Sequence, residues 1–178
     1  MGRADHRAAY EDLLRRYGAP LRRLAWAYEH DPAGREDLFQ EIAMALWTAL
    51  PRFRGESSER TWVYRVAHNT ALTFTASRRR RDSREQPGEP PQEPALPASQ
   101  EREAIEQQRR NVLWAAVQAL PVDERQIVVL HLEGLSAAEI EAITGVSAGA
   151  VATRLTRFRQ KLATQIRGTE TVDEERRA

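Results

Sequence analysis

Residues 134–162 read GLSAAEIEAITGVSAGAVATRLTRFRQKL, and this stretch predicts two helices joined by a tight turn. Gly134 suits the left-handed conformation that ends a preceding helix. Ser136 followed three residues later by Glu139 is a capping box, in which each side chain satisfies a backbone N–H at the start of a helix. The first helix ends shortly before Ser147, which can cap the second. Two helices with a short glycine-containing turn between them form a helix-turn-helix.

The helix after Ser147 has two chemically different faces. Its apolar residues recur at spacings of four, three and four and should face a core: Val151, Leu155, Phe158 and Leu162. The opposite side carries small and polar residues, namely Gly149, Thr153, Thr156, Arg157 and Gln160, with Ala152, Arg154 and Arg159 on its flanks. Small residues followed by arginines suit a helix that enters the DNA major groove and contacts bases and phosphates. The alternative is a compact helical bundle with a solvated polar surface.

Charge is unevenly distributed along the chain, although the formal net charge is only +1. Residues 54–81 contain seven basic residues against two acidic ones, and residues 148–167 contain five basic residues and no acidic one. Residues 82–106 contain seven acidic residues, two basic ones and five of the nine prolines. Such a polar, proline-rich stretch cannot bury enough apolar surface to order itself, so residues 82–103 are expected to be a flexible linker. The two basic segments indicate nucleic acid as a partner.

The rest of the chain is expected to be helical, because apolar residues recur every three or four positions. The N-terminal segment predicts one helix or a helix pair, disturbed near Gly18 and Pro20. Asp31-Pro32 suits the N-cap and first turn of the next helix, and Ser57 or Ser58 can cap a third. The expected fold is therefore all-α, with two small helical domains, the second carrying the helix-turn-helix, joined by the linker.

The first basic segment interleaves aromatic and basic side chains: Arg60, Trp62, Tyr64, Arg65, His68 and Phe74, followed by a run of four arginines that includes Arg78 and Arg79. Aromatic rings stack on unpaired bases while arginines neutralise phosphates, a combination that suits single-stranded DNA. Two alternatives stay open. Trp62 and Phe74 are also spaced as core residues, and the arginine run is also typical of a solvated helix end.

Several segments resemble bacterial sigma factors of the extracytoplasmic-function (ECF) subfamily of the sigma-70 family. Segments similar to sigma domain two are Glu36–Glu41, Ala49–Glu56 and Arg60–Asn69, and those similar to sigma domain four are Leu120–Arg125, Gly134–Ser136, Glu139–Ile140 and Val146–Val151. The resemblance covers roughly Tyr10 to Ile166, with both parts in order. It implies domain two at residues 5–81, a linker at 82–103, domain four at 104–167 and a disordered tail at 168–178.

The resemblance also implies partners and residue roles. Core RNA polymerase would dock on the helix after Asp37 through Asp37, Gln40 and Glu41. The minus-ten element would be opened and held by Arg60, Trp62, Tyr64, Arg65, His68, Asn69, Arg78 and Arg79, with Asn69 near a flipped base. The minus-thirty-five duplex would be read by Ser147, Gly149, Thr153, Arg154, Thr156 and Arg157. An anti-sigma factor is a further expected partner. Many relatives carry Thr and a basic residue where this chain has Ala150 and Ala152, so its minus-thirty-five sequence cannot be taken from a relative.

Several other functions are disfavoured. The chain has no cysteine and only four dispersed histidines, so neither a metal site nor another cofactor is expected. It shows no glycine-rich phosphate loop and no nucleophile–base pair, which argues against an enzyme. It lacks both an apolar run of roughly 20 residues and a signal peptide, so we expect a cytoplasmic protein without membrane insertion. The main alternatives are a helix-turn-helix regulator with an N-terminal dimerisation or sensing domain, and a helical adaptor that binds only proteins.

Overall fold

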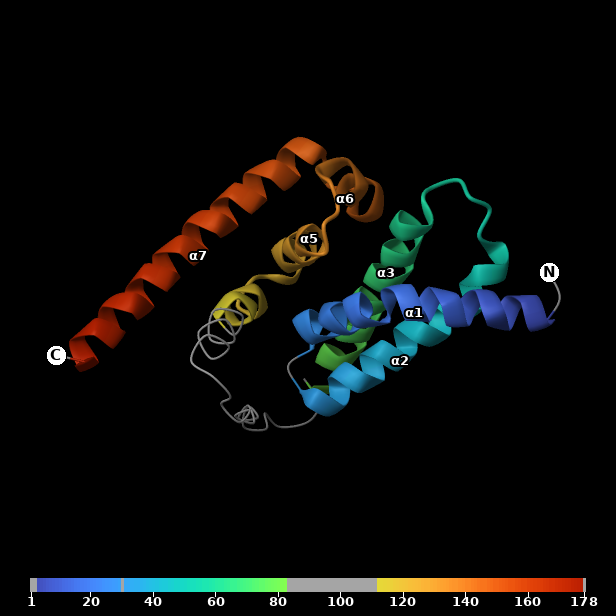
Figure 1. The fold of residues 1–178 in the computed structure, drawn as a ribbon, viewed down its shortest axis with the longest axis horizontal. Coiled ribbons are helices and arrows are strands. Elements are labelled where there is room, and N and C mark those ends of the chain that lie inside the picture. Colours follow the sequence, from blue (N-terminus) through green and yellow to red (C-terminus); the bar gives the residue numbers. More distant parts are fainter. Residues whose placement is uncertain (1–2, 30, 83–111, 178) are drawn as a thin grey trace. The chain divides into compact units, whose positions relative to one another are not determined.

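A computed structural model describes residues 3–29, 31–82 and 112–177. Within these ranges the regular structure is helical, which confirms the all-α prediction, and it forms two compact units. The first unit contains α1 (Arg3–Tyr28), α2 (Pro32–Ala49), the short 3-10 helix η1 (Leu50–Arg52) and α3 (Glu59–Asp82). The second contains α5 (Val122–Leu132), most of α6 (Ala137–Thr144) and α7 (Ala148–Arg177) (Figure 1).

The first helix, α1, is continuous, although the sequence predicts a disturbance near Gly18 and Pro20. An interior proline removes a backbone donor and costs roughly 3 kcal/mol. In this helix Leu13, Leu21 and Leu24 are fully buried on either side of the proline. Burial of one leucine side chain stabilises by about 1.5–3 kcal/mol, so the three together outweigh the cost of the proline.

The second helix, α2, is central to the first unit, because it packs against both α1 and α3. Figure 1 shows α1 and α2 side by side, with α3 crossing them. Leu38, Ile42 and Leu46 are fully buried along α2, which confirms the predicted apolar face. Val63 and Ala67 of α3 are also fully buried in this unit. The opposite side of α2 is polar and exposes Asp37, Gln40 and Glu41.

The starts of α2 and α3 confirm two predicted caps. The Asp31 carboxylate accepts a hydrogen bond from the Gly34 N–H at 2.9 Å. Of the two candidate serines before α3, Ser58 is the cap, and its hydroxyl oxygen accepts from the Thr61 N–H at 3.0 Å. Each side chain satisfies a backbone donor that has no partner within its own helix.

The second unit contains the predicted helix-turn-helix. Gly134 ends the segment after α5 with a φ of 81°, a left-handed conformation that glycine adopts without strain. The capping box is present: the Ser136 N–H donates to the Glu139 carboxylate at 2.8 Å, and the Glu139 N–H donates to the Ser136 hydroxyl at 3.3 Å. Ser147 caps α7 by accepting from the Ala150 N–H at 3.4 Å.

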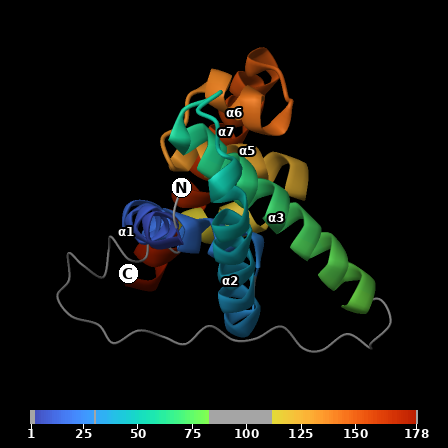
Figure 2. The same ribbon diagram turned by 90° about the vertical axis from the view of Figure 1, so that its right-hand side faces the viewer.

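The apolar face of α7 packs as its spacing predicts. Val151, Leu155 and Phe158 are buried, and α7 packs against α5. The views in Figures 1 and 2 place the short α6 beside the N-terminal end of α7. The core of this unit therefore fixes which side of α7 is left exposed.

The remaining segment predictions concern the linker and the tail. The predicted linker at 82–103 lies outside the described residues, apart from Asp82, which ends α3. The C-terminal helix α7 extends to Arg177 and so includes most of residues 168–178, where the sequence analysis expects an unstructured tail. No proline follows Pro121, so no residue there blocks a helix. In the part of the chain that the structure describes, no helix is long and apolar enough to cross a bilayer.

Candidate nucleic-acid and polymerase interfaces

The exposed side of α7 brings together most of the residues predicted to read duplex DNA. Gly149, Thr153, Thr156 and Arg157 are exposed opposite the buried apolar face, and the cap residue Ser147 is exposed at the start of the helix. No hydrogen bond or ion pair within the described residues holds Arg157, so its guanidinium is available to a partner.

Arg154 differs from the other residues predicted on this side. It is half-buried, and its Nη1 donates to the Asp123 carbonyl oxygen at 3.2 Å and lies 3.9 Å from the Asp123 carboxylate. Asp123 belongs to the first turn of α5, so Arg154 connects α7 to α5. Its guanidinium is thus less available to DNA than that of Arg157.

A further side chain at the start of α7 escapes sequence reasoning. The exposed carboxylate of Glu141, in α6, accepts a hydrogen bond from the Ala148 N–H at 3.0 Å. A carboxylate at a helix N-terminus is favoured by the helix dipole. The two residues lie seven positions apart across a turn, which matches no local capping motif, so only the folded arrangement reveals the pair.

The predicted single-strand residues Trp62 and Arg65 line one hollow of the first unit. This hollow has a volume of about 680 Å³ and is bounded by Pro51, Arg52, Phe53, Arg54, Glu56, Ser57, Trp62 and Arg65. The Trp62 and Phe53 rings lie 4.9 Å apart at 36°. Nε of Arg65 is buried and has no hydrogen-bond partner within the described residues. The hollow therefore combines aromatic surface with the guanidinium of Arg65, whose Nε lies beneath the surface.

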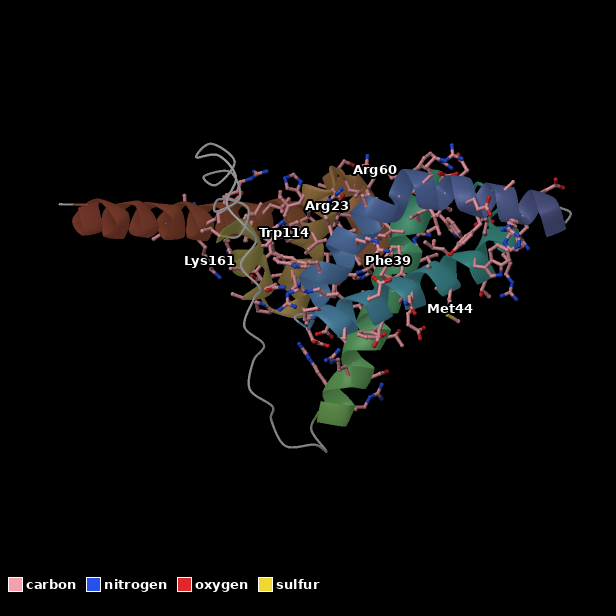
Figure 3. The ribbon with its side chains drawn as sticks, turned by 60° about the horizontal axis from the view of Figure 1, so that its bottom comes forward. Arg23, Phe39, Met44, Arg60, Trp114 and Lys161 are labelled. Atoms are coloured by element: carbon pink, nitrogen blue, oxygen red, sulfur yellow. The ribbon has the colours of Figure 1, made fainter. Side chains whose placement is uncertain are left out.

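Most residues contributed by the loop after η1 were missed by sequence reasoning. Figure 1 shows this loop arching away from the three helices of the first unit before α3 begins. Phe53 and Arg54 of this loop, with Arg52 at the end of η1, line the hollow because the loop folds back towards the first turns of α3. Arg60, also predicted to contact the single strand, is half-buried in the first turn of α3 (Figure 3).

Tyr64 and His68 are core residues, which argues against the prediction that they contact DNA. Their exposed fractions are only 2% and 3%. The Tyr64 ring meets the Tyr17 ring edge-on at 6.3 Å, and His68 Nδ1 lies 3.3 Å from the Tyr28 hydroxyl. Burial lowers the pKa of His68 to about 4, so its imidazole is neutral at pH 7. Both side chains are therefore left out of the proposed DNA surface.

Arg78, another predicted DNA contact, is instead held inside the first unit. Its Nη1 lies 3.1 Å from the Glu29 carboxylate, and its Nη2 lies 3.3 Å from the Asp31 carboxylate. A hydrogen bond from the Gly34 N–H and the Arg78 guanidinium together keep the pKa of Asp31 below its ordinary value. Arg78 thus joins α3 to the turn between α1 and α2, whereas Arg79 is exposed.

The three predicted polymerase-binding residues share a second hollow with Asn69. Asp37, Gln40 and Glu41 are exposed on α2, and Asn69 is exposed on α3. All four line a hollow of about 840 Å³ between these helices. Met44, also in its lining, is 65% exposed and projects from α2 in Figure 3. Acidic, amide and apolar groups thus lie on one continuous surface.

Comparison with known proteins places this arrangement in a family. The model of Sigma-70 region 2 matches residues 13–81, and that of Sigma-70, region 4 matches residues 110–162. These regions correspond to the two helical units, and neither is a catalytic domain. Sigma factors are non-enzymatic factors of transcription initiation.

Individual similar proteins show which group of this family the chain resembles. The chain is 31% identical to the ECF RNA polymerase sigma-E factor of Escherichia coli (strain K12) over 170 residues, covering 89% of this chain and 86% of the relative. It is 29% identical to the RNA polymerase sigma-H factor of Pseudomonas aeruginosa, covering 90% of this chain and 86% of the relative. The chain belongs to the ECF group of the sigma-70 family of RNA polymerase sigma factors.

Two solved structures have the same fold. One is CnrH in complex with the cytosolic domain of CnrY, with a TM-score of 0.63 and 23% identity, covering 91% of this chain and 90% of CnrH. The other is RpoE in complex with the anti-sigma factor NepR from Bartonella quintana, with a TM-score of 0.70 and 21% identity, covering 89% of this chain and 97% of RpoE.

Proposed function

We propose that this sigma factor divides promoter recognition between its units: the first docks on core polymerase and holds the unpaired minus-ten strand, and the second reads the minus-thirty-five duplex. The observation that carries the proposal is the hollow lined by Phe53, Trp62 and Arg65. Arg65 lines this hollow beside the two rings, so its guanidinium can approach a ligand bound there. An unpaired base can stack on the rings while its phosphate or base edge accepts from Arg65.

Asn69 continues the minus-ten surface along α3, because it lies seven residues after Trp62 and four after Arg65 and so shares their face of the helix. It is exposed and carries both a donor and an acceptor, so it can recognise the edge of an extruded base. Arg79 is exposed near the end of the same helix and can neutralise a phosphate. Arg60 and Arg65 lie near the beginning of α3, so cationic groups occur towards both ends of this helix.

The polar side of α2 is the proposed polymerase-docking surface. Asp37, Gln40 and Glu41 lie opposite the buried leucine and isoleucine residues, so a partner can bind them without disturbing the core. Met44, one turn beyond Gln40 and Glu41, adds exposed apolar area to the same surface. Charged residues around an apolar anchor are typical of protein interfaces.

An anti-sigma factor is the proposed regulatory partner, in a stress or envelope response. Both solved relatives are complexes: CnrH is bound to the cytosolic domain of CnrY, and RpoE to the anti-sigma factor NepR. Similarity in fold supports a comparable mode of control, with this chain held in the cytoplasm until release. Binding at either DNA surface would block promoter recognition.

Reconstitution with core RNA polymerase tests the function. The holoenzyme should initiate on a subset of genomic fragments, and permanganate should modify unpaired thymines in their minus-ten elements. Arg65→Gln should reduce this opening without weakening polymerase binding. Arg15→Gln is a matched control, because Arg15 is exposed on α1 and pairs only locally with Asp12 at 3.1 Å. A chain that cannot programme core polymerase, or an Arg65→Gln variant that opens promoters like the wild type, would contradict the proposal.

A further inference from the structure

The exposed side of α7 presents methyl groups at its centre. The Thr153 hydroxyl donates to the Gly149 carbonyl at 3.0 Å, and the Thr156 hydroxyl donates to the Ala152 carbonyl at 3.0 Å. A hydroxyl has one proton, so each of these bonds uses the only donor that the side chain has. What remains available at these positions is the γ-methyl group and oxygen lone pairs.

Three methyl groups gather on this side of α7, from Ala152, Thr153 and Thr156, all exposed. Successive helix residues are about 100° apart and rise about 1.5 Å each, so the three positions fall within roughly 100° of arc and about 6 Å of helix length. On a merely solvated side, threonine would lower helix stability relative to alanine or lysine. Arg157 follows immediately and carries an uncommitted guanidinium.

We propose that Ala152, Thr153 and Thr156 are specificity-determining residues that read thymine by its C5-methyl group in the minus-thirty-five duplex. This inference rests on the proposed duplex-reading role of α7. In the major groove thymine is the base that presents a methyl group, and apolar side-chain atoms recognise it by contact. About 6 Å of helix exceeds one base-pair step of about 3.4 Å, so the surface is long enough to reach two neighbouring thymines. Arg157 then contacts guanine or phosphate beside them.

The test removes one methyl group at a time from each partner. Holoenzyme built from the full chain first selects minus-thirty-five duplexes from a randomised pool. Each thymine in a selected duplex is then replaced by deoxyuridine, which lacks only the C5-methyl. Two neighbouring replacements should each weaken binding about fourfold, the value expected for one buried methyl-sized group.

Matching protein variants connect each DNA methyl to a side chain. Thr153→Ser and Thr156→Ser keep the hydroxyl and delete the methyl, and each should abolish the response to deoxyuridine at one of the two positions. Thr164→Ser is the control, because Thr164 is also exposed on α7 and its hydroxyl makes the same type of bond, to Gln160, at 3.1 Å. This variant should keep both deoxyuridine responses.

Two outcomes would overturn the inference in distinguishable ways. If selected duplexes lack paired thymines, or deoxyuridine duplexes bind as well as thymine duplexes, methyl reading is wrong. The duplex-reading role would still stand in that case, provided that binding stays salt-dependent and falls in Arg157→Ala. If the holoenzyme selects no upstream duplex and Arg157→Ala changes nothing, the proposed role of α7 fails together with the inference.

Discussion

Replacing Gly34 by alanine should weaken the ion pair that joins Arg78 of α3 to Glu29, just before the turn between α1 and α2. A Cβ atom at Gly34 would clash with Arg78 Nη1 and would lie 2.8 Å from the Glu29 Cγ. The Arg78 guanidinium, at the end of a flexible side chain, must then move away from Gly34, and we expect this to separate it from the Glu29 carboxylate, which is 3.1 Å from it in the native arrangement. Glu29, which is nearly buried, then loses this ion pair and keeps the hydrogen bond from the Asp31 N–H at 3.1 Å.

The size of the effect follows from the burial of the pair. Breaking a buried ion pair costs about 3–5 kcal/mol, whereas an exposed pair contributes at most about 1 kcal/mol. The side chains of Arg78 and Glu29 are 35% and 10% exposed, so we expect a loss of about 2 kcal/mol, between these limits. Alanine favours the helix over glycine by up to about 1 kcal/mol, which offsets part of this loss. The net decrease in the free energy of unfolding is therefore about 1–2 kcal/mol.

A double-mutant cycle tests whether the clash between a Cβ at position 34 and Arg78 causes this loss of stability. In an Arg78→Ala background the guanidinium is gone and Glu29 can move, so Gly34→Ala should be neutral or slightly stabilising. Urea unfolding, with hydrogen exchange of the α2 and α3 amides to report on the first unit, gives the free energies. Gly18→Ala is the control, since no atom lies within 4 Å of a Cβ there. Equal effects of Gly34→Ala in both backgrounds would refute the reasoning.

Four further predictions concern pH, polymerase and DNA. The pKa of His68 is about 4 in the folded protein and about 6.5 when unfolded, so the unfolded chain binds the extra proton first. Stability should hold above pH 6.5 and fall by about 3 kcal/mol as the pH drops to 4, and His68→Phe should flatten this part of a urea-unfolding profile. The double variant Asp37→Arg, Gln40→Ala should bind core polymerase more weakly with an unchanged circular dichroism spectrum. Arg157→Ala should lose about 1–3 kcal/mol of duplex binding if it contacts a base edge, or show a salt slope shallower by about one unit if it contacts phosphate. Asn69→Ala should leave duplex binding intact and impair permanganate-detected opening.

Three of these four predictions have a single contrary result. An unchanged pH profile in His68→Phe would mean that another group governs stability in that range. Unchanged polymerase affinity in the Asp37, Gln40 double variant would place docking elsewhere. Wild-type opening by Asn69→Ala would give that side chain a purely structural role.

Local features of this fold were predictable from the sequence. Asp31, Ser58, Ser136 and Ser147 act within three residues of the N–H groups that they cap. A periodicity of three and four likewise defines the buried side of α7, because packing on one side imposes that spacing on the sequence. The exposed side of α7, proposed to read duplex DNA, could therefore be predicted, including the exposure of Arg157.

Only the tertiary structure decided which residues of α3 are buried in the core, which line the hollow and which form ion pairs. This helix buries a wide arc because both α1 and α2 pack against it, so Tyr64 and His68 enter the core while Trp62 stays at the hollow. Arg78 meets Asp31 across 47 positions of sequence, and no local pattern encodes that distance. Spacing within a helix determines which residues share a face. Whether that face meets solvent, another helix or an ion pair depends on segments far away in the chain.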